Sequence, residues 1–489
     1  MGEMTVAIIG AGIGGLAAGC YAQSNGLQVH IFEAHNWPGG LCTSWKRNGF
    51  TFDGSIHHLA GCRSGNLVYR MWEELGAMPR DCIFPERLTQ VVSADGRTFD
   101  VFIDIGRLED HMLAEFPVDR TEVLKYTNAV RAFRKHDLLE APVRSRAGLL
   151  RYLAATPLLL RWAKPTMADV GTRFHDPFLR SAFPTIQYDW STIPAMMHLN
   201  ILAQCSLHNY GFPIGGSLPF SQSIECRFRS LGGEISYGAR VTKILMQGNR
   251  AVGVRLADGT EVRADGVISN AFAPTTLFDL LEQHLIDDRT RSRFALREDS
   301  MTMGVHVSLG VDRDLRDEPQ ALVLLQEQPV QLADQTLDRI PVELYGFDQS
   351  LAPAGKSVIK VLLNTSYAYW ERLAQDRAQY HEAKDRLAET VIRVLEPRLP
   401  GITSQIETID VATPLTTERF TGNGRSYGPR SGSSDMLSMI LSRPRRLPAI
   451  RNLQLVGQSA GGGGIPGCAA MGRNAVRALV KELKPTSRS

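Results

Sequence analysis

Apolar runs and glycine-rich turns alternate at the start of the chain. Residues 5–10 (TVAIIG) are short, apolar and β-branched, which predicts a buried parallel strand. A glycine-rich turn follows, residues 16–25 (LAAGCYAQSN) have helical character, and Gly26 ends that helix. Residues 27–33 (LQVHIFE) predict a second strand. The N-terminal segment therefore predicts a β–α–β unit.

Beyond this unit the pattern changes several times. Residues 106–210 are mostly helical in pattern, and a cluster of helix-breaking residues follows at 210–217 (YGFPIGGS). Helices are predicted over 218–231, 381–396 and 468–483, and strands over 85–105 with a turn at Asp95-Gly96, 234–236, 240–247, 251–256, 262–269, 300–365 and 453–456. The end of the chain returns to strand, glycine loop (457–467) and helix, which predicts two interleaved units.

Composition narrows the functional classes. The chain has 489 residues with 54 basic and 51 acidic side chains, a balance that argues against nucleic-acid binding. No apolar run reaches the roughly 18 residues of a spanning helix. The seven cysteines are scattered and never spaced as CxxC, which predicts reduced thiols and a cytoplasmic protein. The 12 histidines show no metal-ligand spacing, so no metal site is predicted.

The first glycine-rich turn has the spacing of a dinucleotide site. Gly10, Gly12 and Gly15 allow a tight turn, close approach of the backbone to a pyrophosphate, and close helix packing. The following helix N-terminus favours the phosphate charge. Glu33 ends the second strand, where its carboxylate suits a ribose diol and disfavours a 2′-phosphate.

Two further glycine loops favour FAD over NAD. Gly39 and Gly40 follow shortly after Glu33, and the C-terminal loop at 457–467 supplies a third backbone-rich contact. Three converging loops suit a long, extended FAD that stays bound. No second GxGxxG follows a strand, so the expected electron partner is a quinone, oxygen or an external reductant.

The chain also resembles the phytoene desaturase group, which includes carotenoid desaturases, carotenoid cis–trans isomerases and retinol saturases. The matching blocks are the N-terminal glycine motif, PGG, GFTFDGSIHH, YGFPIGGS, SNAFAPTT, TPLTTERFTGN and GGGGIPGCAAMGRNA. The resemblance is weak over residues 110–200, where a substrate would be selected.

The resemblance implies an α/β fold. A Rossmann-type FAD-binding domain, glutathione reductase-like and of the amine oxidase type, would be interleaved with an α+β substrate domain. The FAD-binding domain is expected over residues 1–75, 212–300 and 445–489. The substrate or lipid-binding domain is expected over residues 76–211 and 301–444.

The resemblance also implies which residues contact FAD. By position they are Gly10, Gly12, Gly14, Gly15 and Glu33 at the ADP half, Gly39, Gly40 and Ser44 near the pyrophosphate, the backbone of Val241 at the adenine, and Gly457, Gln458, Gly464, Ile465 and Gly467 along the ribityl chain and flavin. Two residues depart from the pattern of relatives. Leu41 replaces a basic residue, and Gln458 replaces an aspartate of isomerase-like members, which is closer to the saturases.

Candidate catalytic groups lie in the GFTFDGSIHH block. His57 and His58 are expected near the flavin, where an imidazole suits acid–base chemistry or polarisation of a polyene. The alternative is that one packs structurally and the other binds backbone. Asp53 is expected to hold the local turn, and Arg419, Arg425 and Tyr427 are further candidates for the pocket wall.

Two segments raise the question of lipid contact. Residues 149–164 (LLRYLAATPLLLRWAK) predict either a basic amphipathic helix with Trp162 at its edge, lying on a membrane face, or core-facing helices broken at Pro157. Residues 183–197 line either a polyene tunnel or ordinary core.

Three functions stay open from the sequence. The first is an FAD-dependent oxidoreductase acting on CH–CH or C=C bonds of a hydrophobic isoprenoid, such as a carotenoid- or retinoid-like polyene, as desaturase, saturase or isomerase. The second is a flavin amine oxidase. The third is a non-catalytic, flavin-bound lipid carrier.

Overall fold

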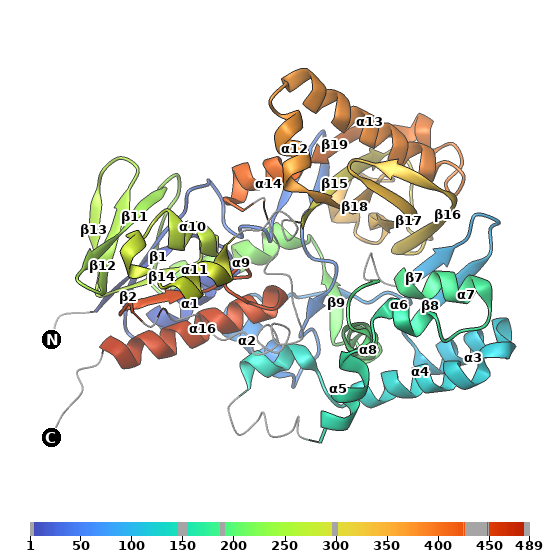
Figure 1. The fold of residues 1–489 in the computed structure, drawn as a ribbon, viewed down its shortest axis with the longest axis horizontal. Helices are drawn as coiled ribbons and strands as arrows, with labels where there is room; N and C mark the ends of the chain where they lie inside the picture. The colour runs from blue at the N-terminus through green and yellow to red at the C-terminus, as the bar shows by residue number, and fades with distance from the viewer. Residues whose placement is uncertain are drawn as a thin grey trace.

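The computed structural model describes residues 4–144, 154–185, 191–295, 302–423, 425, 447 and 449–483. Its first unit is built on a five-stranded parallel sheet with the order β10-β2-β1-β14-β20. The strands are β1 (Thr5–Ile9), β2 (Gln28–Phe32), β10 (Glu234–Ser236), β14 (Gly266–Ser269) and β20 (Leu453–Leu455). Four regions far apart in the sequence thus meet in one sheet, on the left of Figure 1.

Helices α1 (Ile13–Gln23) and α16 (Gly464–Leu483) pack against each other beside this sheet (Figure 1). Their close approach requires glycine, because a Cβ on Gly472 would lie 2.4 Å from the Gly14 carbonyl oxygen. The surrounding elements are β3 (Ser44–Arg47), β4 (Phe50–Asp53), β5 (Leu59–Ala60), α2 (Leu67–Glu74), β9 (Tyr210–Pro213), α9 (Ser217–Ser230), α10 (Ala273–Phe278) and α11 (Asp288–Phe294).

A small antiparallel sheet joins β11 (Val241–Gln247), β12 (Arg250–Leu256) and β13 (Glu261–Arg263). The single strand predicted over residues 262–269 is therefore wrong, because the chain divides into β13 and β14. Asp265 lies at the break, where its backbone amide donates to the Thr5 carbonyl at 2.9 Å and its carboxylate accepts from the Thr5 amide at 2.8 Å. These contacts turn the chain onto the edge of β1.

The second unit is built on a seven-stranded sheet with the order β19-β15-β18-β17-β16-β7-β8. Along β16, Leu322 and Leu324 belong to one hydrophobic core and Val323 to another, as the two-residue period of a strand requires. The strands are β7 (Arg87–Val92), β8 (Thr98–Phe102), β15 (Thr302–Val311), β16 (Ala321–Leu332), β17 (Gln335–Leu344), β18 (Ser357–Ser366) and β19 (Ile406–Ala412), and β6 (Cys82–Ile83) pairs with β9.

Helices cover both faces of this sheet. One core contains Leu387, Val391 and Leu395 of α13, and the other contains residues of α3, α4 and α8. The helices are α3 (Ile105–Glu115), α4 (Arg120–Phe133), α5 (Thr156–Ala163), α6 (Met167–Gly171), α7 (Pro177–Ala182), α8 (Ala195–Cys205), α12 (Tyr367–Leu373), α13 (Arg377–Leu395) and α14 (Pro414–Thr421), with a 3₁₀ segment η2 (Leu138–Val143).

Two helices begin at other residues than predicted, and a third decides between two alternatives. The predicted start of α13 at His381 is wrong, because Asp376 caps the helix through the amides of Ala378 and Gln379. The helix predicted from residue 468 begins at Gly464. In α5, Trp162 is 2% exposed and lies in the helical core, which agrees with the core-facing alternative and not with a place at the edge of an amphipathic helix.

The remaining sequence expectations concern membrane spans, metals and thiols. No helix within the described ranges is long and apolar enough to cross a membrane. Residues 145–153, part of the proposed amphipathic segment, lie outside the described residues. The seven cysteines are free thiols, as predicted. Over the part of the chain that the structure describes, no group of His, Cys, Asp or Glu is arranged as a metal site.

Candidate flavin and substrate site

The glycine turns predicted to bind the cofactor lie together in the structure. Gly12 forms a parallel bridge with Gly39, and the Gly39 amide donates to the Ala11 carbonyl at 2.9 Å. A Cβ on Gly40 would lie 3.5 Å from Gly12 Cα, and one on Gly14 would lie 3.2 Å from the Gly457 amide nitrogen. All three loops therefore converge at the start of α1.

These loops leave no room for side chains. A Cβ on Gly15 would lie 2.1 Å from the Gly10 carbonyl oxygen, and one on Gly39 would lie 2.2 Å from the Cys42 carbonyl oxygen. Gly12, the N-cap of α1, offers no side chain to its first amides. Backbone N–H groups at such a helix start suit a phosphate group. The loops thus fit the pyrophosphate of a dinucleotide.

Glu33 and Val241 lie beside the N-terminal glycine turn. The Glu33 carboxylate accepts from the amides of Ala11 at 2.7 Å and His35 at 2.8 Å, and each oxygen keeps a further lone pair for a hydroxyl. The Ala239 amide donates to the Glu33 carbonyl at 2.8 Å, which brings the start of β11 alongside. Val241 is buried as the first residue of that strand. This arrangement fits a ribose and a base.

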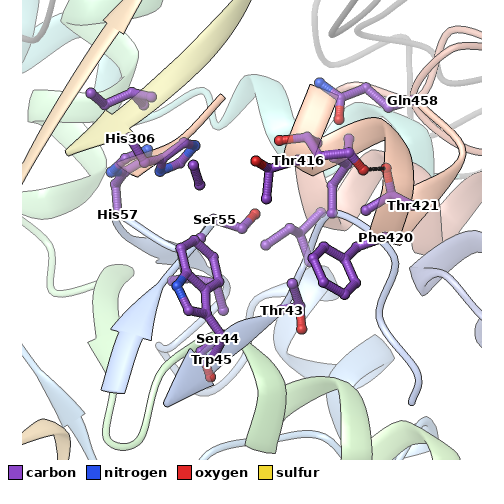
Figure 2. A pocket seen from close by; sticks show the side chains of 18 of the residues that line it. Thr43, Ser44, Trp45, Ser55, His57, His306, Thr416, Phe420, Thr421 and Gln458 are labelled. Atoms are coloured by element: carbon purple, nitrogen blue, oxygen red, sulfur yellow. Dashed lines mark hydrogen bonds between the residues drawn. The ribbon is translucent and has the colours of Figure 1, made fainter. Parts of the chain in front are cut away.

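The C-terminal loop leads into a large cavity. Gln458, Gly464 and Ile465 line it, and Gly467 is buried in the first turns of α16. The cavity has a volume of about 1670 Å³ and is lined on other sides by Ser44 of β3 and by residues of η2, α8, α13 and α14. In Figure 2, Thr43, Ser44 and Trp45 lie on one side of this space and Gln458 and Thr421 on another.

His57 and His58, the candidate catalytic groups, both line the cavity. His57 Nδ1 contacts the carboxylate of Glu343 in an ion pair. A carboxylate at Nδ1 holds the ring orientation and keeps a proton on that nitrogen. In Figure 2, His57 and His306 lie across the pocket from Gln458.

Glu343 belongs to a buried charged network. Its second oxygen lies 2.7 Å from Lys360 Nζ and 2.9 Å from the Tyr345 hydroxyl, and Lys360 is 1% exposed. Glu343 and Lys360 are directly opposed on β17 and β18. Burial alone would raise the pKa of Glu343, but the charges of His57 and Lys360 hold it well below its usual range. The carboxylate is therefore ionised at neutral pH.

Two other histidines in the cavity wall are neutral. Burial, with a smaller effect of His57, lowers the pKa of His58 to about 4, and its ring stacks on Tyr210. Burial, followed by the charge of Lys360, lowers the pKa of His306 to about 3. His306 contacts the edge of Trp45 with 6.2 Å between ring centroids. These rings line the cavity without adding charge to it at neutral pH.

Asp53 holds the turn that carries the histidines, which confirms its predicted role. One carboxylate oxygen accepts from the amides of Ser55 at 3.0 Å and Ile56 at 3.1 Å. It also accepts from the Ser217 hydroxyl at 2.8 Å, and the other oxygen from the Ser217 amide at 2.5 Å. Asp53 thereby ties the loop to the start of α9.

Several other sequence candidates also lie at the site. Arg419 lines the cavity, as do Thr192, Ile193, Pro194 and Met197 from the segment over residues 183–197. Phe183 is instead buried in the helical core, and residues 186–190 lie outside the described ranges. Arg425 pairs with Glu371 and Glu418, and Tyr427 lies outside the described residues.

Sequence reasoning missed four polar residues of the site. Asn270 places its amide between the glycine loops, with Nδ2 2.4 Å from where a Gly12 Cβ would lie. Glu343, Lys360 and His306 belong to strands of the second unit. A signal was present for Lys360, because a single charge within the apolar run of residues 357–363 (SVIKVLL) implies a buried partner.

Comparisons with known proteins agree with this geometry. The model of a family described as flavin containing amine oxidoreductase matches residues 13–480. A chloroplastic prolycopene isomerase of Daucus carota is 26% identical over 94% of this chain and 76% of its own length. A lycopene-forming phytoene desaturase of a Paracoccus species is 25% identical over 98% of each chain.

Similarity to solved structures concerns the fold alone. An oxidoreductase from Methanosarcina mazei superposes with a TM-score of 0.62 at 19% identity, covering 98% of this chain and 100% of the other. The amine oxidase-type fold and the resemblance to carotenoid desaturases and isomerases, both predicted from the sequence, are thereby confirmed.

Proposed function

The chain belongs to the family of flavin containing amine oxidoreductases, and on that premise we propose that it is an FAD-dependent enzyme acting on CH–CH or C=C bonds of a hydrophobic isoprenoid polyene. The reaction is a desaturation, a saturation or a cis–trans isomerisation. The observation that carries the proposal is the cavity of about 1670 Å³, which extends from the C-terminal glycine loop to the apolar residues of α8.

FAD is the form of flavin that the loops support. Gly12, Gly39 and Gly457 suit a pyrophosphate, and Glu33 suits the ribose of an adenosine. A flavin without an adenosine half would leave the Glu33 carboxylate without its proposed ribose partner. Bound FAD supplies hydride exchange with carbon at its N5 atom. A quinone, oxygen or an external reductant is the proposed electron partner.

His57 is the proposed acid–base or polarising group. Its ring lines the cavity, and Glu343 fixes its orientation through Nδ1. Glu343 and Lys360 are positioning residues in this proposal, since the lysine compensates the buried carboxylate. His58 is uncharged at neutral pH and contributes shape and a weak dipole to the same wall.

An amine substrate fits the cavity poorly. Within the described part of the cavity wall only Asp410 is acidic, and Arg47 already binds its carboxylate at 3.2 Å. Basic side chains from α13 and α14 also line the cavity. A protonated amine would meet repulsion there, whereas a neutral polyene would not.

The direct test is anaerobic absorbance of the oxidised protein mixed with phytoene, prolycopene or an isoprenoid polyene that ends in a carboxylate, each in detergent. Bleaching of the flavin band would mean desaturation, and product formation only after reduction of the flavin would mean saturation or isomerisation. Retained flavin with neither bleaching nor product would favour a lipid carrier and overturn the proposal. Peroxide formation from amines alone would establish an amine oxidase.

We also propose a cytoplasmic protein with peripheral contact to the membrane face through α5. Leu160 of this helix is 71% exposed and Arg161 is exposed beside it. An exposed leucine next to a cation suits insertion among anionic headgroups. Leu160→Asp should reduce co-sedimentation with anionic vesicles several-fold. Val118→Asp, at a residue that is 65% exposed and precedes α4, is the matched control. Equal binding of both variants and wild type would contradict the proposal.

A further inference from the structure

One wall of the cavity is a cationic helix face. Arg377, Tyr380, His381 and Lys384 of α13 all line the cavity. Residues three, four and seven positions apart share one face of an α-helix, so these side chains form a single stripe directed to the same space. The helix packs on the sheet through other residues, among them Leu387 and Val391.

The cations of this face have no ion-pair partner among the described residues. Within the described ranges, no ion pair joins Arg377, Lys384 or the neighbouring Arg419 to an acid. Lys384 lies 5.7 Å from the centre of the Tyr380 ring, and Arg419 lies 4.6 Å from that of Phe420. Among the lining residues that the structure describes, Asp410 is the sole acid, and its carboxylate is shared by Arg47 and by Trp45 Nε1 at 2.9 Å. The described residues on this side of the cavity carry a net positive charge.

Another wall of the cavity is apolar. Leu139 and Pro142 of η2, Ile193, and Met197 and Ile201 of α8 line it. In Figure 1 α13 lies at the top of the molecule and α8 lies below it, and the start of α16 contributes Ile465 and Pro466 to the same cavity. The space therefore connects an apolar region, the region beside the glycine loops, and a cationic region.

We propose that the substrate is a long apolar polyene that ends in a carboxylate, with the carboxylate bound by Arg377 and Lys384 and the chain directed toward α8. A planar guanidinium binds a carboxylate through two parallel hydrogen bonds, and an ammonium adds a point charge. A pure hydrocarbon would displace water from these cations and offer them no hydrogen-bond acceptor in its place. Desolvating a charge in this way costs free energy. This inference rests on the proposed function and specifies the substrate class of that site.

The test uses flavin-loaded protein and cis-parinaric acid, a fluorescent polyene fatty acid, against its methyl ester. The acid should bind about tenfold more tightly than the ester, as loss of a charge-assisted hydrogen bond implies. Arg377→Gln combined with Lys384→Gln should weaken binding of the acid by a similar factor and leave the ester unchanged. Arg386→Gln, on the same helix where Arg386 pairs with Glu382 outside the cavity, should change neither.

Each contrary result has a distinct meaning. Equal affinities of wild type for acid and ester would overturn the inference, as would an equal loss in Arg386→Gln, since that would show a general charge effect. Phosphatidylcholine vesicles with phosphatidylglycerol test the alternative that these cations bind lipid phosphates. Loss of vesicle binding in the double variant with unchanged acid binding would overturn the inference.

The same samples separate this inference from the proposed function. Preference for the acid, with neither flavin bleaching nor product after flavin reduction from the acid, phytoene or prolycopene, would overturn the proposed function and support the carboxylate site. Hydride exchange with acid and ester alike at equal affinities would support the proposed function and overturn the carboxylate site.

Discussion

Single side chains at the glycine loops set how closely a cofactor can approach. Asn270 places its amide where a side chain on Gly12, Gly14 or Gly457 would collide with it. The motif spacing identifies the glycines, but it cannot identify Asn270, because that residue reaches the site only once β14 pairs with β1. A local sequence pattern does not show which strands pair, so it cannot show which residues such pairing brings to the site.

Gly12→Val should produce colourless protein. The added Cβ alone would lie 2.4 Å from Asn270 Nδ2, so the side chain would displace either Asn270 or the pyrophosphate. Flavin content per protein, measured by absorbance after purification, tests this expectation. Gly106→Val is the control, since its Cβ would meet only the Asp104 carboxylate at 3.3 Å. If Gly12→Val protein is yellow and fully loaded with flavin, the pyrophosphate does not bind beside Gly12.

His57→Ala should lower turnover by about 10²-fold or more while retaining flavin, because general acid–base groups contribute on that scale. Glu343→Gln should alter the pH dependence of turnover, since it removes the carboxylate that holds His57 Nδ1. Turnover on a substrate of the proposed reaction, measured across pH, gives both results. An unchanged pH profile in Glu343→Gln would restrict Glu343 to a structural role.

Whole elements were predictable where their signals are local. The β-branched run of β1, the Asp95-Gly96 hairpin between β7 and β8, and the end of α1 before Gly26 all agree with the sequence. What the sequence mispredicted or left open depends on contacts outside the element. Asp265 breaks a continuous β pattern by binding Thr5, and Trp162 is buried because α5 packs against α8.

Helix α8 carries a residue that makes stability depend on pH. His198 is buried against the Tyr126 hydroxyl at 2.7 Å, and burial lowers its pKa to about 3 from 6.5. Between pH 3 and pH 6.5, His198 is protonated in the unfolded chain and neutral in the folded chain. The stabilisation that the neutral ring provides is therefore complete above pH 6.5 and is lost as the pH falls toward 3.

His198→Asn should accordingly flatten the acid dependence of stability. Below pH 6.5 the free energy of unfolding of wild type should fall more steeply with pH than that of His198→Asn. The two slopes should differ by at most about 1.4 kcal/mol per pH unit, which is the limit for one titrating residue. Urea unfolding between pH 7 and pH 5 measures the slope. His284→Asn, at an exposed histidine, is the control. Parallel slopes for wild type and His198→Asn would contradict the expectation.

The whole molecule is held together at the boundary of its two sheets. Glu343 and Lys360 belong to the seven-stranded sheet, whereas His57 and the Asp53 carbonyl, which accepts from Lys360 Nζ at 3.2 Å, belong to the loop beside the glycine turns. His57 and Glu343 are 286 positions apart, a pairing that no sequence window contains. This network joins the two units at the cavity.

Glu343→Gln should lower the free energy of unfolding at pH 7 by about 3 kcal/mol, because it leaves Lys360 buried without its carboxylate. The folded pKa of Glu343 is depressed, so its stabilisation is complete above pH 4.5 and is lost as the pH falls through the lower folded value. The difference from wild type should therefore shrink in acid. Glu327→Gln, at an exposed glutamate of β16, should be neutral in urea unfolding.

The order of strands in the parallel sheet also constrains how the protein is made. Strand β20 and the start of α16 complete the cofactor pocket, yet residues 453–483 leave the ribosome after every other strand of that sheet. During synthesis β14 has an open edge, which is a target for aggregation until β20 arrives. The cofactor pocket is therefore completed only after residues 453–483 have been synthesised, and flavin supply and chaperone capacity both bear on the yield of active protein.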